Sequence, residues 1–405
     1  MADPRTIVIL CDTAQVDGGL GKVAVTSALS LKEAGCDVIY FCPGNGTDPR
    51  LAASGVEVIE LGQPFAAEDP HRLRGMRRGL WNTEAAQALR HRLAGCDPAA
   101  TVLHCHGYSK LLSPAIGPVL TDGRFAAVYT MHEFFLACPN GGFFDFQRQE
   151  ICTRKPLGMS CLTTHCDSRS RAIKGYRVLR QAVLHGPGKL PRHLRDVIAI
   201  SDTQDRVMRP YLPKDTQVHR ISNPVDWLDT DRVAVEQNSH FLFIGRLAPD
   251  KGAAELARAA KEAGVRVTFV GDGPERARIQ SILPDAEVTG WLDPAGVHDW
   301  LGRARALVMP SLWYECQPLV PLEALRRGVP VITGAWNAAH EAVEHGQTGL
   351  IYDATDDLAA TLSQMTPDAA GGMSRRAYAQ RDSYGLSPAE HATQLLSVYS
   401  EILSR

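Results

Sequence analysis

Short hydrophobic runs recur along the chain and alternate with longer amphipathic stretches. Apolar runs of roughly four to eight residues bounded by turn residues are typical of buried strands, whereas apolar residues three or four apart are typical of helices. Strands that alternate with helices form parallel sheets, so the pattern predicts two doubly wound α/β domains. The strands are expected in two series, near 6–11, 37–42, 56–60, 101–105, 126–131, 196–200 and 217–221, then near 240–245, 265–270, 286–290, 305–309, 329–333 and 349–352.

A polar, turn-rich segment separates the two series. We expect an N-terminal domain over 1–226, a hinge over 227–239, a C-terminal domain over 240–385 and a terminal segment over 386–405, whose helical pattern runs from 388 to 403. The chain has 405 residues, and a single hydrophobic core stops growing at about 250 to 300 residues. The length therefore agrees with two domains.

Composition and charge exclude several classes of protein. With a net charge of −2 the chain has no overall attraction to nucleic acid. Met1 leads almost directly into the apolar strand Thr6–Leu10, which lacks the flanks of a signal peptide, and no apolar run approaches the roughly 20 residues that cross a bilayer. We therefore expect a cytoplasmic location, where the ten cysteines are thiols or metal ligands more often than disulfides.

Two glutamates eight positions apart are the most informative local feature. Glu315 and Glu323 lie between two apolar runs, in a segment that predicts a loop and a short helix. In a continuous helix they would be about 12 Å apart, too far to act on one small atom but suited to the two ends of an elongated ligand. Backbone N–H groups at the helix start, near Gln317, Pro318 and Leu319, can donate to hydroxyl or phosphate oxygens. The alternative is two surface glutamates on an ordinary helix.

Two basic residues follow the first strand of the C-terminal domain. Arg246 and Lys251 come between this strand and an alanine-rich helix expected over 253–263. The carboxyl edge of an open α/β sheet is where ligands bind, and a helix N-terminus there favours anions. Together with the glutamate pair they predict a site for a nucleotide sugar, although each alone would be read as a solvated loop charge.

An ordered set of short motifs across residues 240–352 carries a family resemblance. Each motif is weak alone, but the set in this order is specific. The motifs are Gly245-Arg246, Lys251-Gly252, Val270 to Pro274, Val288-Thr289-Gly290, Pro310-Ser311, Glu315, Glu323-Ala324, Gly328 to Ile332, Glu341 and Gly346 to Leu350. In this region the chain resembles the retaining, nucleotide-sugar-dependent glycosyltransferases of family 4, which have the GT-B fold. The first half matches less densely.

The resemblance implies a fold, an activity and roles for residues. It implies two Rossmann-like domains that face each other across a cleft, with the terminal helix crossing back to the first domain. The implied reaction transfers a hexosyl unit from a UDP- or GDP-sugar to a glycan, lipid-linked or small-molecule acceptor, in bacterial polysaccharide or other carbohydrate biosynthesis. Glu315 would hold sugar hydroxyls and Glu323 the ribose, Arg246 and Lys251 would bind the diphosphate, and Gly290 would contact the donor. The leaving phosphate would itself deprotonate the acceptor.

The first domain contributes a glycine loop and a histidine. Gly18 and Gly19 precede a helix expected over 23–34, with neither the dinucleotide nor the Walker spacing. They form either a plain tight turn or a close approach to a ligand, and the resemblance implies the second, near the donor diphosphate. His132 ends a strand and matches the family's Thr-x-His position, which implies contact with the transferring sugar or the acceptor. Glu133 stands where relatives commonly have aspartate.

A loop rich in Pro, Gly, Asn and Arg holds a cluster of cysteines. Cys138, Cys152, Cys161 and Cys166 fall within one short stretch, with His165 beside the last. Such a loop orders poorly by burial alone, and a tetrahedral thiolate site would order it. We weigh a structural zinc site, with an iron–sulfur site second, against buried or loop thiols, because the spacings are not paired C-x-x-C knuckles.

No metal is expected at the reaction centre. Asp229-Thr230-Asp231 has the Asp-x-Asp form that holds a divalent ion in another glycosyltransferase fold, but it lies in the expected hinge and is read as linker. We therefore expect chemistry that needs no cofactor.

Two basic stretches bear on partners. The first interleaves Arg72, Arg74, Arg77 and Arg78 with Leu73, Met76, Leu80 and Trp81, and the second contains Arg169, Arg171, Lys174, Arg177 and Arg180. They are either solvated helix faces, the more usual case, or a peripheral contact with an anionic membrane at its inner face.

Three other functions are compatible with this sequence. A nucleotide-sugar epimerase would use no acceptor, and a phosphorylase would consume free phosphate and release a sugar phosphate. A catalytically inactive nucleotide-sugar-binding protein would show no turnover, although the complete set of Arg246, Lys251, Glu315 and Glu323 argues against it.

Overall fold

The computed structural model describes residues 4–16, 18–226 and 230–405. Its residues form two compact units. The first comprises residues 1–142, 154–224 and 386–405, and the second comprises 143–153 and 225–385. Of the expected hinge over 227–239, residues 227–229 lie outside the described part, and they include Asp229 of the Asp-x-Asp triplet.

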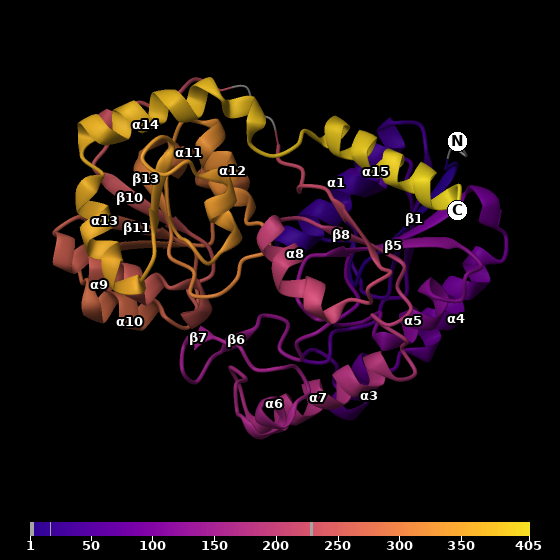
Figure 1. The fold of residues 1–405 in the computed structure, drawn as a ribbon. Coiled ribbons are helices and arrows are strands. Elements are labelled where there is room, and N and C mark those ends of the chain that lie inside the picture. The colour runs from indigo at the N-terminus through magenta and orange to yellow at the C-terminus, as the bar shows by residue number, and fades with distance from the viewer. Residues whose placement is uncertain (1–3, 17, 227–229) are drawn as a thin grey trace. The chain divides into compact units, whose positions relative to one another are not determined.

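The first unit is built on a seven-stranded parallel sheet with the order β3-β2-β1-β4-β5-β8-β9 (Figure 1). Its strands are β1 (Thr6–Leu10), β2 (Asp37–Cys42), β3 (Glu57–Glu60), β4 (Thr101–Cys105), β5 (Ala126–Met131), β8 (Asp196–Ala199) and β9 (Gln217–Arg220). Its helices are α1 (Gly19–Glu33), α2 (Pro49–Ala53), α3 (Arg72–Leu80), α4 (Thr83–Leu93), α5 (Gly117–Leu120), α6 (Met159–Thr163), α7 (Arg171–His185), α8 (Asp202–Met208) and α15 (Pro388–Leu403).

The central strands β1 and β4 are mostly apolar and almost wholly buried, as both faces of a parallel sheet require. Strand order reverses between β1 and β4, which pair in register from Thr6 with Thr101 to Leu10 with Cys105. Chain segments leave such a switch point in opposite directions, which opens a crevice at the carboxyl edge. The loops after β1, β4 and β5 start at this edge.

The terminal helix α15 belongs to the first unit. It packs against α1 and β5, and its His391 Nε2 lies 3.0 Å from the Ser27 hydroxyl of α1. At its end, Arg405 pairs with Asp196 of β8 at 3.0 Å. The last residues of the chain thus complete the core that the first residues begin.

The second unit holds a six-stranded parallel sheet with the order β12-β11-β10-β13-β14-β15. Its strands are β10 (His240–Ile244), β11 (Arg266–Val270), β12 (Glu287–Gly290), β13 (Ala304–Met309), β14 (Val331–Gly334) and β15 (Gly349–Tyr352). Its helices are α9 (Ala253–Ala263), α10 (Arg276–Ile282), α11 (Pro294–Gly302), α12 (Leu319–Arg326), α13 (Leu358–Gln364) and α14 (Pro367–Ala379). The order reverses between β10 and β13, so the second switch point lies where Arg246 and Lys251 on one side and Glu315 on the other leave the sheet.

The cysteine loop contains an antiparallel hairpin that the sequence pattern did not predict. Strands β6 (Phe144–Asp145) and β7 (Glu150–Ile151) have two residues each, too few to show a period. The Asp145 carboxylate accepts from the backbone N–H of Gln147 at 3.1 Å and so fixes the turn. This segment was expected in the N-terminal domain, but the structure groups residues 143–153 with the second unit.

In the described residues no helix combines the length and the hydrophobicity needed to cross a bilayer.

Candidate functional site

The second unit gathers a set of charged and polar side chains at its switch point. Gly252 has a φ of 68°, and a Cβ on it would lie 2.0 Å from the Pro310 carbonyl oxygen. Only glycine allows this approach, which brings the loop after β10 against the loop after β13. The contact places Lys251 opposite Glu315.

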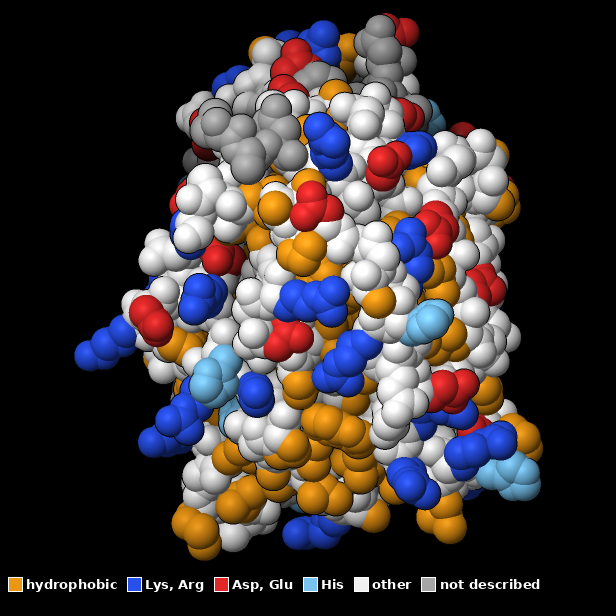
Figure 2. Space-filling view, turned by 90° about the vertical axis from the view of Figure 1, so that its right-hand side faces the viewer, with side chains coloured by type: hydrophobic (Ala, Val, Ile, Leu, Met, Phe, Trp, Pro, Cys, Tyr) orange, Lys and Arg blue, Asp and Glu red, His pale blue; other side chains and the backbone are white. Residues whose placement is uncertain are grey.

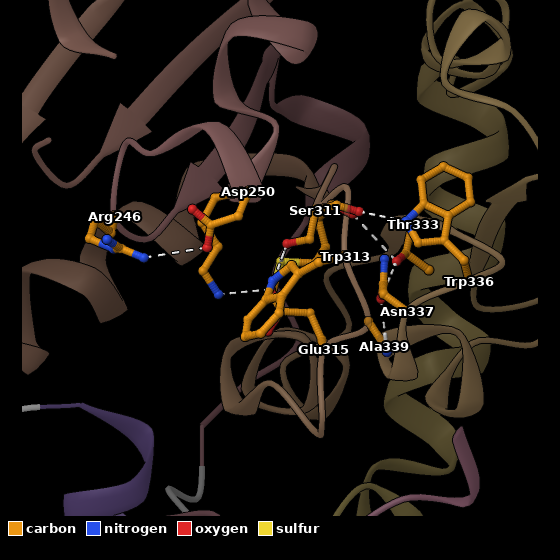
Figure 3. A network of polar contacts seen from close by, with 11 residues as sticks. Arg246, Asp250, Ser311, Trp313, Glu315, Thr333, Trp336, Asn337 and Ala339 are labelled. Atoms are coloured by element: carbon orange, nitrogen blue, oxygen red, sulfur yellow. Dashed lines mark hydrogen bonds and ion pairs between the residues drawn. The ribbon is translucent and has the colours of Figure 1, made fainter. Parts of the chain in front are cut away.

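Three donors converge on one oxygen of Glu315 (Figure 3). The Lys251 ammonium donates to Oε1 at 2.7 Å, the Ser311 hydroxyl at 2.6 Å and the Trp313 indole N–H at 2.9 Å. Burial by itself raises the pKa of Glu315, which is only 6 % exposed, but the Lys251 charge and the hydrogen bonds outweigh it and hold the pKa below its ordinary value. Glu315 is therefore a carboxylate at neutral pH, held rigidly by its neighbours.

Arg246 is held less tightly. Its guanidinium donates to Asp250 Oδ2 at 3.3 Å, and its side chain is 57 % exposed while Asp250 is buried. The Lys251 ammonium also lies 5.1 Å from the centre of the Trp313 ring, a cation–π distance. The site therefore presents one exposed and one half-buried cation at the edge of the sheet.

A second polar group borders Glu315. Asn337 accepts from the Thr333 hydroxyl at 3.1 Å and from the backbone N–H of Ala339 at 3.0 Å, and the Trp336 indole donates to the Ser311 carbonyl at 2.8 Å. Figure 3 shows this group on the opposite side of Glu315 from Arg246. It fixes the loop after β14 to the Ser311 loop.

The remaining predicted donor residues lie on three segments of the same unit. Pro318 is the N-cap of α12, and in the described part of the chain the structure shows no side-chain hydrogen bond that caps this helix. A helix N-terminus favours anionic ligands, so the start of α12 lies within the candidate site as a positive dipole end. Glu323 lies half-buried inside α12, whereas Glu315 lies in the loop before it. The two glutamates thus do not share one helix. Gly290 ends β12 with a φ of 77° and open space where a Cβ would stand.

The first unit places its own predicted residues at its switch point. Gly18 is the N-cap of α1 and Gly19 its first residue, so the helix starts four residues earlier than predicted. Apart from the adjacent residues and the helix's own backbone, no atom of the described residues lies within 4 Å of a Cβ built on either glycine. Among the residues that the structure describes, no side chain caps the α1 N-terminus.

His132 belongs to a chain of histidines. His106 Nδ1 lies 3.0 Å from His132 Nε2, and His104 lies 2.5 Å from the Tyr399 hydroxyl and 2.6 Å from the Thr130 hydroxyl. Burial lowers the pKa of His132 to about 3, and it also lowers the pKa values of His104 and His106. All three are neutral at pH 7, so within the His106–His132 pair one nitrogen donates and the other accepts.

Glu133 is the titratable group beside His132. Burial raises its pKa to about 7, against the opposing attraction of Lys110 and Arg180. A carboxyl group with a pKa near neutral can exchange protons with a hydroxyl group, so Glu133 is a candidate acid or base at this edge.

The cysteines are divided between the units. All ten are free thiols. Cys138, Cys161 and Cys166 lie in the first unit, and Cys152 lies in the segment grouped with the second. The Lys174 ammonium lies 3.1 Å from Cys166 Sγ and 3.6 Å from Cys161 Sγ. Over the described ranges no group of three or more His, Cys, Asp or Glu residues is arranged to hold a metal ion, so the zinc site stays a prediction without support from the geometry.

Several site residues were not predicted. Ser311 was noted only as part of a motif, and Trp313, Asn337 and Asp250 carried no signal of their own. His104 and His106 do carry a sequence signal, because they lie two positions apart at the end of β4 and so can share a face. Tyr399 had none, since it is 295 residues from its partner His104.

Comparison with known proteins identifies the family of the chain. Residues 17–227 match the model of Glycosyltransferase Family 4, and residues 238–368 match that of Glycosyl transferases group 1. The glycogen synthase of Mycobacterium tuberculosis (strain ATCC 25618 / H37Rv) is 28 % identical over 394 residues, which cover 90 % of this chain and 86 % of that protein. The GDP-mannose-dependent alpha-mannosyltransferase of Mycolicibacterium smegmatis is 35 % identical over 112 residues, 27 % of this chain and 29 % of that protein.

Solved structures give the same fold. The sucrose-phosphate synthase of Thermosynechococcus elongatus superimposes with a TM-score of 0.69 at 17 % identity, over 99 % of each chain. The Anabaena protein HepE in complex with UDP and glucose superimposes with a TM-score of 0.67 at 16 % identity, over 98 % of this chain and 100 % of that one. The chain therefore belongs to glycosyltransferase family 4 and is a glycosyltransferase with the GT-B fold.

Proposed function

We propose that the protein transfers a hexosyl unit from a nucleoside diphosphate sugar to an acceptor hydroxyl with retention of anomeric configuration and without a metal at the reaction centre. The observation that carries the proposal is the convergence of Lys251, Ser311 and Trp313 on Glu315, beside the uncapped start of α12. This arrangement combines a fixed carboxylate, two cations and a helix N-terminus within one unit.

Each group has a chemical role in the proposal. The Glu315 oxygen that does not face Lys251 accepts from sugar hydroxyls, and Glu323 accepts from the ribose. Arg246 and Lys251 neutralise the leaving diphosphate together with the N–H groups at the α12 N-terminus. Preorganised donors of this kind contribute roughly 2.7 to 4 kcal/mol each to the stabilisation of a developing negative charge.

The donor base is either uridine or guanosine. The HepE structures that resemble this fold hold UDP or UDP-glucose, and the mannosyltransferases that match about a quarter of the chain are GDP-mannose-dependent. The acceptor is a glycan, a small molecule or a lipid-linked sugar, and the last would bring the first unit to a membrane surface. In the first unit, His132 and the glycines at the start of α1 are assigned to the reacting sugar and the diphosphate.

Thermal unfolding with UDP, GDP, ADP and no ligand tests the nucleotide site. A ligand at about 100 times its dissociation constant stabilises the folded state by about 2.7 kcal/mol. We expect one nucleotide to raise the melting temperature of the parent and not of Glu323→Ala. Glu262→Ala, an exposed glutamate on α9, is the matched control and should respond like the parent. No shift with any nucleotide would refute the proposed donor site.

Turnover tests the remaining parts. Product analysis by NMR with the accepted donor should show the same anomeric configuration in donor and product, and turnover should persist in EDTA. An inverted product would refute retention, and loss of turnover in EDTA would refute metal independence.

A further inference from the structure

Exposed apolar side chains concentrate on three neighbouring helices of the first unit. Seven large hydrophobic side chains are exposed in the described part of the chain, and five of them lie on α3, α6 and α7. These are Leu73, Met76, Met159, Leu162 and Leu179. Leu73 is 83 % exposed and Met159 is 76 % exposed, which is unusual for side chains that gain free energy by leaving water.

The three helices lie side by side along one end of the unit (Figure 1). The Tyr176 hydroxyl of α7 donates to the Met76 carbonyl of α3 at 2.9 Å, and Lys174 of α7 contacts Cys161 of α6 at 3.6 Å. On the face of this unit that Figure 2 presents, hydrophobic side chains gather toward that same end, with Lys and Arg side chains around them. We call the surface of α3, α6 and α7 the basic–apolar face.

Helix α7 has its polarity reversed. An ordinary surface helix turns charged residues to water and apolar residues inward. In α7, Arg177 pairs with buried Asp167 at 3.2 Å, and Arg180 donates to the Ser109 carbonyl at 2.6 Å. After Arg171, which is also exposed, the exposed positions of α7 are Ala172, Gly175, Leu179 and Ala182, spaced as one helical stripe.

Helix α3 repeats the arrangement. Arg74 and Arg78 both pair with Asp69, which is buried, at 2.8 Å and 3.4 Å. These arginines fasten the helix to the protein through one carboxylate, while Leu73 and Met76 point away from it. Each helix has one mostly buried arginine in these pairs, Arg78 on α3 and Arg177 on α7, while the leucine and methionine side chains stay exposed.

The charge of the face has one sign. The three helices carry eight Lys or Arg residues and no Asp or Glu, in a chain whose net charge is −2. Arg72, Arg77, Arg169 and Arg171 are exposed, and across the described residues none of these four lies within ion-pair distance of a carboxylate. A second copy of this face would be repelled by it, because like charges would be brought together as water is excluded.

We propose that the basic–apolar face rests on an anionic lipid surface. Apolar side chains held outward among unpaired arginines match a bilayer interface, where leucine and methionine enter the acyl boundary and arginine remains with the lipid phosphates. A merely solvated helix face accounts for the arginines but not for the outward leucines and methionines. The proposal adds a partner to the transferase proposal and does not rest on it, because none of these residues belongs to the donor site.

Co-sedimentation with lipid vesicles tests the proposal. The full chain should bind vesicles of phosphatidylcholine mixed with anionic phosphatidylglycerol, and bind pure phosphatidylcholine weakly. Binding should fall steeply between about 0.1 M and 1 M salt, as the Debye length shrinks from about 10 Å to 3 Å. Arg72→Gln combined with Arg171→Gln should weaken binding roughly 30-fold, taking the usual contribution of an arginine near an anionic surface.

The apolar half of the face has its own test and control. Leu73→Ser and Leu179→Ser should each weaken binding by on the order of tenfold, since each removes a side chain that would leave water. Lys261→Gln, an exposed lysine on α9, is the matched charge control and should bind like the parent. All variants should keep the parent's melting temperature and its response to nucleotide.

Three outcomes would overturn the inference. The first is that the parent does not bind anionic vesicles, and the second is that the arginine and leucine variants bind as well as the parent. The third is that vesicles do not bind while sedimentation velocity shows self-association of the parent, which Leu73→Ser abolishes. The last would assign the face to a second copy of the chain. Nucleotide stabilisation remains a separate readout, so failure here leaves the donor site to be judged alone.

Discussion

Removal of Lys251 tests whether the Glu315 cluster is an integrated site. In Lys251→Met, Glu315 keeps its Ser311 and Trp313 donors but loses its only charge partner among the contacts that the structure describes. Breaking a buried ion pair costs about 3 to 5 kcal/mol. We take about 3 kcal/mol, because the Lys251 side chain is 22 % exposed and two neutral donors remain. For a domain of about 150 to 250 residues this lowers the melting temperature by roughly 6 to 12 °C.

The double variant Lys251→Met, Glu315→Gln separates charge from packing. The amide that Glu315→Gln introduces would still accept from Ser311 and Trp313 but carry no charge, so most of the lost stability should return. Scanning calorimetry resolves the transition of the second unit. Lys261→Met removes an exposed lysine from α9 and should change the melting temperature by little, since surface substitutions stay within about 0.5 kcal/mol.

The pH dependence gives a further check with a definite sign. The pKa of Glu315 is lower in the folded protein than its ordinary value of 4.5. The ion pair therefore stabilises the fold above about pH 4.5 and loses that contribution as pH falls through the folded pKa. The gap between parent and Lys251→Met should narrow in acid. A single variant that melts within 2 °C of the parent at neutral pH, with ~1 kcal/mol or less lost, or a double variant no more stable than the single, would refute the reasoning.

Other predictions follow from separate features. Gly252→Ala should destabilise the second unit by more than about 2 kcal/mol because its Cβ would meet the Pro310 carbonyl, whereas Gly264→Ala, with φ 65° and open space, should cost only about 1 kcal/mol in urea unfolding. The melting temperature of Glu133→Gln should rise relative to that of the parent between pH 5 and pH 8. Since Glu133 has a folded pKa of about 7, the parent loses up to about 3 kcal/mol of its free energy of unfolding over this range, and equal pH profiles of the two proteins would contradict the prediction. Between pH 6.5 and pH 4, His132→Asn should lose less stability than the parent, by about 1.4 kcal/mol per pH unit. The reason is that His132 stays neutral in the folded protein down to about pH 3, whereas it becomes protonated in the unfolded chain. Parallel acid-unfolding curves for the two proteins would contradict the prediction.

The sheets could be predicted from the sequence because parallel strands are buried on both faces. Each predicted apolar run corresponds to a strand of one of the two large sheets, and α9 and α15 begin and end at the expected residues. Burial of a whole strand leaves a continuous hydrophobic run, which is a strong local signal. The β6–β7 hairpin leaves none, since its strands have two residues each and its turn is held by a hydrogen bond that the Asp145 carboxylate accepts from the Gln147 N–H.

Site residues could be predicted from the sequence where a charged or histidine side chain comes at or near the end of a predicted strand. Arg246, Lys251, Glu315 and His132 were selected because they come directly after or near apolar runs. Their mutual contacts could not be predicted: Glu315 was assigned to the sugar and Lys251 to the diphosphate, and the structure joins the two side chains at 2.7 Å. That contact depends on the Gly252 approach to Pro310, which only the folded chain reveals.

The placement of α15 has a consequence for synthesis on the ribosome. The first unit needs Tyr399 for His104 and His391 for Ser27, yet residues 225–385 are translated before α15 appears. Translation proceeds at about 5 to 20 residues per second, so the α1 and β5 surfaces of the nascent first unit stay exposed to solvent for roughly ten to thirty seconds. A chain that ended at residue 385 would contain the whole second unit but lack α15, so its first unit would keep the α1 and β5 surfaces exposed to solvent.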